Sequence, residues 1–279
     1  DAGIAFPDKA RVGIILSTAF GPHVTTFRFL DDILQFGEAA VSPTAFSSSV
    51  HTAAASYLAS NLGVRGPVTT LADFHFPFHE ALFLADLWLR EGICDHVLAG
   101  YVEECGTVME YIFGNKLAVS ADGRMEPLAF NTPGGIPSEG GAFFLLGNDT
   151  GTPAYARVAE IIRARTGVTM PLASLQILDA CGILPDEAAY LQLASESVPV
   201  ADYAPLTGSL PGGSAFHCIA GALMLKHQVR FACPFSSNPH GLRLADPADK
   251  SPLTGVYCTK LNCYSDARSI RLERPGKST

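Results

Sequence analysis

The sequence lacks the features that mark several large classes of protein. No apolar run reaches the roughly 18 residues that a membrane-spanning helix needs, and we find no signal peptide, so we expect a cytoplasmic protein. Lysine and arginine form no strongly basic stretch, and the formal net charge is −8, which argues against a nucleic-acid partner. Two short basic patches, at 163–165 and 268–274, are the candidate docking places for an acidic carrier protein.

Paired cysteine motifs are also missing. The seven cysteines are scattered, odd in number and without a Cys-x-x-Cys pair. This pattern is typical of reduced thiols that mostly pack in a core. We therefore expect Cys94 to be a core residue, and we expect no structural zinc and no cofactor.

Apolar residues, in contrast, are abundant. Hydrophobic residues make up 48% of the chain and charged residues only 16%, which favours an α/β fold with a covered sheet or a large apolar subunit interface. At 279 residues the chain can form one domain or two fused halves. A Gly/Pro-rich stretch at 148–153 suggests halves at 1–150 and 151–279 that together form one compact unit.

The pattern of apolar residues and of Gly and Pro breaks predicts alternating strands and helices. We expect strands at 11–17, 68–72, 96–101, 138–147, 155–162 (with a helical continuation as an alternative), 255–261 and 268–272. We expect helices at 25–36, 48–62, 80–91, 186–194 and 213–226. Loops are expected at 102–109, 115–135 and 205–213, and a disordered tail at 275–279.

Residues 68–100 form the most informative stretch: a strand, a tight loop, a buried helix and a second strand. A sharp turn from a strand into a helix is a common place for a nucleophile, because the first-turn N–H groups are unpaired and the helix dipole favours an anion. The loop at 73–78 offers three phenylalanines and one histidine, but no serine or cysteine. The predicted geometry therefore suits a nucleophile that the sequence does not supply.

Residues 81–100 resemble the helix and strand that follow the active-site turn of β-ketoacyl synthases. Two further blocks, at 42–67 and 138–146, resemble the same family in order and spacing. Two downstream blocks, at 206–216 and 257–272, are also similar to segments of the family. The resemblance implies a thiolase-like α/β fold with two related βαβ-rich halves in stacked helix and sheet layers, and an N-terminal region shortened relative to the family.

The family's chemistry requires a cysteine at the turn and two histidines that promote malonyl decarboxylation. The corresponding positions here are His75, Cys181 and Gly213, and the Gly-rich turn that frames the oxyanion site starts at Asn262. The fold blocks are retained while the catalytic residues are replaced. This combination resembles a chain-length factor, the non-catalytic partner of an active ketosynthase in a heterodimer, most like those of aryl-polyene clusters. Acyl carrier protein is then expected as a transient partner.

By the resemblance, the turn and a neighbouring helix would line an acyl tunnel or a subunit interface. The candidates are Phe74, His75, Phe76, Phe78 and His51, with ordinary core packing as the alternative for each. His75 and His79 have the i, i+4 spacing of a helical metal site, but Pro77 lies between them. We expect no metal there.

Two other functions remain open. One is a condensing enzyme or acyltransferase with a reassigned active site, which would use His75, Cys181 or His217. The other is a homodimeric thiolase-like binding module. Each candidate also has a purely structural interpretation. Cys181 would be a buried core residue, and His217 would be a buried helical residue with a backbone or serine partner. Glu103 and Glu104 would form a solvated or loop-capping pair.

Overall fold

The computed structural model describes residues 9–117, 119–130, 134–148, 154–165, 173–184, 188–194 and 197–275. These residues form two compact units, within Asp1–Glu110 with Glu139–Asp149 and within Tyr111–Ser138 with Thr150–Thr279. We call them the first and the second unit and describe each by itself. No helix in the described ranges is long and apolar enough to cross a membrane.

The first unit contains a four-stranded mixed sheet. Its strands are β1 (Val12–Thr18), β2 (Val68–Ala72), β3 (His96–Glu103) and β4 (Gly140–Gly147), in the order β2-β1-β3-β4. β1 pairs in parallel with β2 and β3, and β4 pairs antiparallel with β3. All seven residues of β1 are buried. Because successive side chains of a strand point to opposite faces, both faces of the sheet are covered at β1, as the apolar composition predicted.

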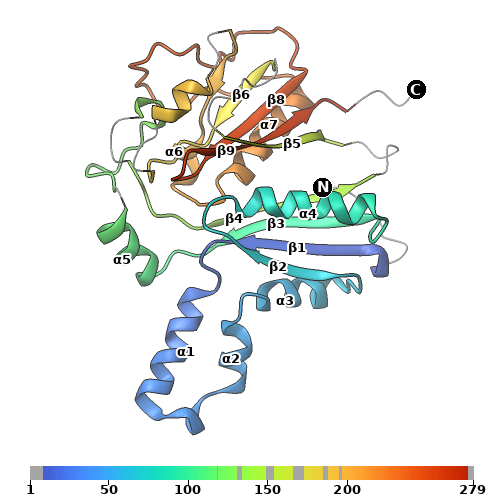
Figure 1. The fold of residues 1–279 in the computed structure, drawn as a ribbon, viewed down its shortest axis with the longest axis vertical. Helices are drawn as coiled ribbons and strands as arrows, with labels where there is room; N and C mark the ends of the chain where they lie inside the picture. The colour runs from blue at the N-terminus through green and yellow to red at the C-terminus, as the bar shows by residue number, and fades with distance from the viewer. Residues whose placement is uncertain are drawn as a thin grey trace. The chain divides into compact units, whose positions relative to one another are not determined.

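Four helices belong to the first unit: α1 (His23–Phe36), α2 (Pro43–Ser49), α3 (Ala53–Leu62) and α4 (Pro77–Arg90), with short 3₁₀ turns at Lys9–Arg11 and Glu38–Ala40. Figure 1 shows α1 and α2 beside one another, away from the sheet. The prediction of one helix at 48–62 is wrong, because α2 ends at Ser49 and α3 begins at Ala53. Ser47 and Ser49 donate side-chain hydrogen bonds to carbonyls within α2, which competes with helix continuation, and Val50 is extended.

Helix α4 packs on β1 and β3. It begins at Pro77, three residues earlier than predicted, because proline needs no N–H partner at the first helical position. The contact with β1 is tight at Gly13, where a Cβ atom would lie 2.9 Å from the ring of Trp88 and from Sγ of Cys94. Cys94 is 2% exposed, which confirms its prediction as a core residue.

The second unit contains a five-stranded mixed sheet. Its strands are β5 (Arg157–Arg165), β6 (Leu175–Leu178), β7 (Val200–Ala201), β8 (Gly255–Leu261) and β9 (Asp266–Glu273), in the order β5-β9-β8-β6-β7. β6 pairs in parallel with β7 and β8, and β9 pairs antiparallel with β8 and β5. The path β7-β6-β8-β9 therefore repeats the order and directions of β2-β1-β3-β4. This repetition confirms the two related halves.

The remaining helices are α5 (Thr107–Lys116), α6 (Ala204–Thr207) and α7 (Ser214–His227), with 3₁₀ turns at Pro127–Ala129 and Ala188–Gln192. Three local predictions are corrected. The loop expected at 102–109 holds the end of β3 and the start of α5, and the loop expected at 205–213 contains most of α6. The described part of the helix expected at 186–194 is a 3₁₀ turn. Residues 149–153 of the expected half boundary and 276–279 of the expected tail lie outside the described residues.

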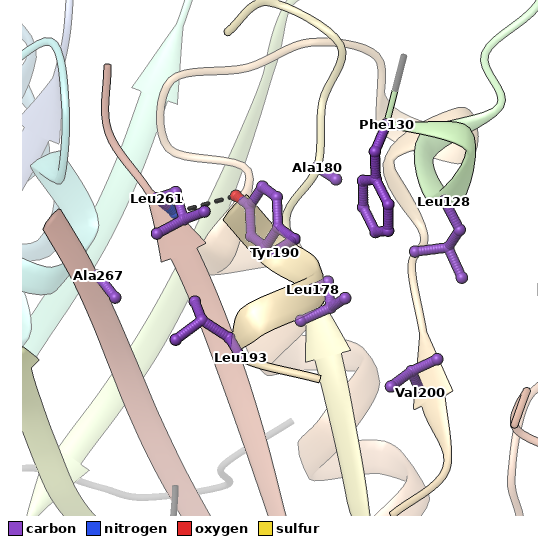
Figure 2. Close-up of a cluster of buried hydrophobic side chains, with 9 residues drawn as sticks. All are labelled: Leu128, Phe130, Leu178, Ala180, Tyr190, Leu193, Val200, Leu261 and Ala267. Atoms are coloured by element: carbon purple, nitrogen blue, oxygen red, sulfur yellow. Dashed lines mark hydrogen bonds between the residues drawn. The ribbon is translucent and has the colours of Figure 1, made fainter. Parts of the chain in front are cut away.

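A hydrophobic cluster in the second unit draws on segments far apart in the chain. Figure 2 shows Leu128 and Phe130 beside side chains from β6, β7 and β8. Tyr190 is fully buried among them, and its hydroxyl bridges two backbone groups: it accepts from the N–H of Leu261 at 2.9 Å and donates to the carbonyl of Asp179 at 2.6 Å. This tyrosine therefore fixes the ends of β6 and β8 relative to one another.

Candidate functional sites

Each unit has one candidate site at the carboxyl ends of its parallel strands. In the first unit it is the turn at 73–78 between β2 and α4, which we call the turn site. In the second unit it is a group of buried ionisable side chains at the ends of β6, β7 and β8, which we call the charged cluster. Its members are Asp179, Asp202, His217 and Lys260.

The backbone of the turn site is held by an aspartate. Oδ1 of Asp73 accepts hydrogen bonds from the N–H groups of His75 at 2.6 Å and Phe76 at 3.2 Å. Amides at the start of a helix normally form the anion-binding groups of such a turn. Here the chain's own carboxylate binds the amides of His75 and Phe76, the two residues that directly precede α4.

The aromatic side chains of the turn site divide into two groups. Phe76 and Phe78 are buried, at 3% and 0% exposure, and the ring of Phe78 lies 5.0 Å from that of Phe144. Both side chains are therefore buried in the first unit, and a tunnel-lining role for them stays a prediction. Phe74 is 62% exposed, with its ring 5.2 Å from that of Phe20, while His75 is half-buried. Only Phe74 and His75 present surface to a ligand or partner.

The other histidines near the turn site are not arranged for metal binding. His75 precedes α4 while His79 lies within its first turn, so the two do not share a helical face. Within the described ranges, no group of three or more His, Cys, Asp and Glu side chains is placed to hold a metal ion. His51 lies in the turn between α2 and α3 rather than on a helix, and its exposed ring covers Gly21.

Glu103, at the end of β3, is a buried carboxylate that the sequence did not single out as such. It is 3% exposed and accepts hydrogen bonds from the amides of Ala19 and Phe20, and from the hydroxyls of Thr18 and Tyr101. Burial raises the pKa of Glu103, and these four hydrogen bonds oppose the rise. The predicted loop-capping role of Glu103 is thus confirmed, whereas the alternative prediction, that its side chain is solvated, is wrong.

In the charged cluster, Asp179 is held by opposite charge. Its Oδ2 lies 2.9 Å from Nζ of Lys260 and accepts from the hydroxyl of Ser214 at 2.8 Å. Both ionic groups are at most 5% exposed. Burial disfavours the charged carboxylate, but Lys260 and His217 outweigh that effect and hold the pKa of Asp179 below its usual range.

Two of the positions that the resemblance aligns with the family's catalytic residues, Cys181 and Gly213, border this cluster. Cys181 is 2% exposed, and its Sγ lies 3.9 Å from Nζ of Lys260. At Gly213 the backbone is ordinary, yet an added Cβ would lie only 2.7 Å from Oδ1 of Asp179. The carboxylate therefore occupies the space that a side chain at position 213 would need.

His217 completes the cluster from the first turn of α7 and is 1% exposed. Its Nε2 lies 3.2 Å from the backbone nitrogen of Tyr203, which donates to it, and 3.5 Å from Oδ1 of Asp202. Burial lowers the pKa of His217, but the two aspartates outweigh burial and raise it above its ordinary value. For Asp202, burial is the larger effect and raises the pKa of the carboxyl. The predicted burial and backbone partner of His217 are both present.

Sequence reasoning passed over three of the four cluster members. Asp179 and Asp202 each follow a short apolar strand directly, and Lys260 lies in an otherwise uncharged strand. A charged residue inside a buried strand is seldom tolerated without a partner. That signal was present in the sequence, but the identity of the partners depends on the tertiary fold.

Comparison with known proteins supports the resemblance in two ways. Residues 5–106 match the family model described as beta-ketoacyl synthase, N-terminal domain. A search of curated proteins finds no significant match. Solved structures match over nearly the whole chain, at identities so low that they establish the fold alone.

One such structure is the ishigamide ketosynthase/chain length factor, with a TM-score of 0.79 and 15% identity over 95% of this chain and 76% of that chain. Another is a beta-ketoacyl synthase from Burkholderia phymatum STM815, with a TM-score of 0.79 and 16% identity over 98% and 78%. A third is a ketosynthase of a type II PKS, solved with its acyl-carrier protein, with a TM-score of 0.75 and 16% identity over 96% and 80%. The thiolase-like ketosynthase fold predicted from the sequence is therefore confirmed.

Proposed function

We propose that this chain, which has the ketosynthase fold and an N-terminal segment of the β-ketoacyl synthase family, is a catalytically silent chain-length-factor subunit. It would pair with an active β-ketoacyl synthase and bound the tunnel that receives the growing acyl chain in polyketide or fatty acid elongation. Acyl carrier protein would visit the pair transiently. Aryl-polyene synthesis is the specific pathway class that we propose, on the resemblance alone.

The observation that carries the proposal is the state of the turn site. The residue at the nucleophile position is His75, and its amide already donates to Asp73 at 2.6 Å. An oxyanion forming there would have to displace a carboxylate and would meet its negative charge. Charge development at this turn is therefore opposed, whereas a catalytic site stabilises it.

The second unit supports the same conclusion. A histidine cannot be accommodated at position 213 without moving Asp179, which is fixed by Lys260 and Ser214. Polar side chains of the unit thus stabilise the fold at places where the family positions catalytic groups.

A subunit role is supported by an exposed apolar surface on the first unit. In α1 only His23 is buried, although the helix is largely apolar. The exposed apolar residues of the α1–α3 region are Val24, Phe27, Leu30, Leu34, Phe36, Phe46, Val50, Tyr57 and Leu62. A surface of this kind marks an interaction site in a soluble protein, and β2 is an edge strand of the same unit.

The test is co-expression with a cognate, catalytically intact ketosynthase. We expect a 1:1 complex by light scattering after gel filtration, and acyl elongation that requires both chains. In the complex, Leu34→Asp, at 85% exposure, should abolish pairing, whereas Leu206→Asp, at 70% exposure in the second unit, should leave it intact. A soluble monomer that binds no ketosynthase would contradict the proposal.

A second candidate function, a transferase with a reassigned site, is favoured by one observation. Cys181 lies 3.9 Å from a buried lysine, and a nearby cation stabilises a thiolate. Incubation with an acyl-coenzyme A donor and intact-mass analysis separates the two functions. An adduct that disappears in Cys181→Ser, but persists in Cys263→Ser at the exposed thiol, would establish the transferase. Its absence favours the silent subunit.

A further inference from the structure

The ring of His217 is surrounded by more hydrogen-bonding groups than one protonation state can serve. Nε2 faces the amide of Tyr203 at 3.2 Å and Oδ1 of Asp202 at 3.5 Å. Nδ1 faces Oδ1 of Asp179 at 3.9 Å, and neither of these two atoms has a hydrogen-bond partner among the described residues. All of these side chains are at most 5% exposed, so water cannot easily substitute for a missing partner.

The two protonation states select different partners. A neutral ring with its proton on Nδ1 keeps a lone pair on Nε2, which accepts from the amide of Tyr203. A charged ring is a donor at both nitrogens. It therefore loses the hydrogen bond from the amide of Tyr203 and can donate to the carboxylates of Asp179 and Asp202. The distances in the structure fit the neutral ring on the Nε2 side, and each carboxylate lies less than about an ångström beyond hydrogen-bond reach.

The charges of the cluster favour a proton on the ring. With Asp179 and Asp202 ionised and Lys260 charged, a neutral His217 leaves one net negative charge in a buried site, whereas a charged His217 balances it. Burying an unbalanced charge is costly. The other ionisable groups near the cluster include Cys181, Tyr203, Cys218, Cys233 and Cys258. Burial raises the pKa of Tyr203, of Cys218 and of Cys233, which keeps these three groups neutral.

The amide that changes partner lies at a structural junction. Tyr203 is the N-cap of α6, and Asp202 accepts from the amides of Ala204 and Ala180 at 2.8 Å each. Pro205, the next residue of α6, lines a groove of about 540 Å³ together with Met125, Ile136 and Phe235. A shift of the turn at 202–204 would therefore move one wall of this groove.

We propose that protonation of His217 switches its Nε2 from accepting the Tyr203 amide to donating to Asp202, and that this exchange repositions the start of α6 beside the groove. The inference does not depend on the proposed subunit function, because it concerns hydrogen bonds within the second unit. The protonated arrangement forms at a pH below the ordinary pKa of histidine and is lost as pH rises through the raised pKa of His217.

The first experiment follows the wild-type chain by hydrogen exchange and by NMR of ¹⁵N-labelled histidine. We expect the amide of Tyr203, corrected for intrinsic exchange rates, to be less protected at pH 6 than at pH 8.5. We expect the ring of His217 to be protonated at pH 6 and to lose that proton as the pH rises. Equal protection at both values, or a ring that stays neutral at pH 6, would overturn the proposal.

The second experiment compares His217→Gln with His227→Gln, which removes the exposed histidine at the other end of α7. In wild type and His227→Gln, the unfolding equilibrium constant should rise with pH above about 6.5, by up to about tenfold per pH unit for one proton. His217→Gln should lack this rise. If His217→Gln does not fold, the wild-type titration alone decides; if it folds and keeps the wild-type pH dependence, the switch is excluded.

Discussion

The two sheets follow the same path, yet their carboxyl ends bury polar groups by different means. In the first unit, Glu103 is a single carboxylate surrounded by four neutral donors. In the second, Asp179 and Asp202 are balanced by Lys260 and His217. Neutral donors leave the pKa of the carboxylate raised, whereas an adjacent ammonium lowers it. The same backbone geometry can therefore carry opposite electrostatic designs.

The largest predicted effect comes from removing the cation of the charged cluster. Lys260→Met leaves Asp179 buried without its ammonium partner, which should cost about 3–5 kcal/mol of unfolding free energy. Urea unfolding measures it, with Lys250→Met at an exposed position as the matched control. Adding Asp179→Asn should recover part of the loss in a double-mutant cycle. Additive effects would show that the two charges are not coupled.

A smaller effect is expected from the neutral site. In Glu103→Gln, the side-chain NH₂ would face two hydrogen-bond donors, the amide of Ala19 and the hydroxyl of Tyr101, which donate to the carboxylate in the wild type. We expect the unfolding free energy to fall by about 1–3 kcal/mol. The fluorescence of Trp88, the one tryptophan of the sequence and part of α4 in this unit, reports it. Glu104→Gln, at a half-exposed residue that accepts from one described amide, should cost less. A larger loss for Glu104→Gln would reverse our ranking of the two glutamates.

Lowering the pH should change stability in opposite directions at the two buried carboxylates, Asp179 and Glu103. Because Lys260 holds the pKa of Asp179 below its usual range, its contribution to stability is present at neutral pH and is lost as pH falls through the lowered pKa. Glu103 has a raised pKa, so the folded state binds its proton more tightly, and its effect has the opposite sign. Hydrogen exchange followed as the pH is lowered from about 5 to about 2 should show the acid loss concentrated in β6 and β8. Asp179→Asn should flatten that loss; an unchanged acid profile in this variant would argue against the ion pair as its source.

The smallest predicted effect tests the turn site. Asp73→Ala removes the acceptor of two backbone amides and should lower the unfolding free energy by about 1 kcal/mol. Asp86→Ala removes an exposed i, i+4 pair with Arg90 on the same unit's α4 and should cost only about 0.3–0.5 kcal/mol. Both are measured by Trp88 fluorescence in urea. Equal losses would mean that Asp73 acts as an ordinary surface residue.

Local signals predicted the elements that combine a clear apolar run with Gly or Pro at the boundary. β2 and β8 fall on their predicted bounds, and α7 differs by one residue at each end. The misses have local causes that apolar periodicity does not detect. Serine side chains end α2, and α6 is too short for a periodic pattern. Phe76 and Phe78 could not be assigned to the core from spacing, because their burial depends on partners such as Phe144.

The sequence by itself determined the ketosynthase-like architecture, and the resemblance predicted that the family's catalytic residues are replaced at positions 75, 181 and 213. Both features depend only on the type and order of the residues, so local patterns and the resemblance are enough to predict them. Only the tertiary structure decided what surrounds these positions: Asp73 binds the amide of His75, and Asp179 fills the space beside Gly213. These contacts join residues that only the fold brings together, so sequence patterns do not reveal them. Burial makes them strong, because a charged group that is removed from water needs a partner within hydrogen-bond distance.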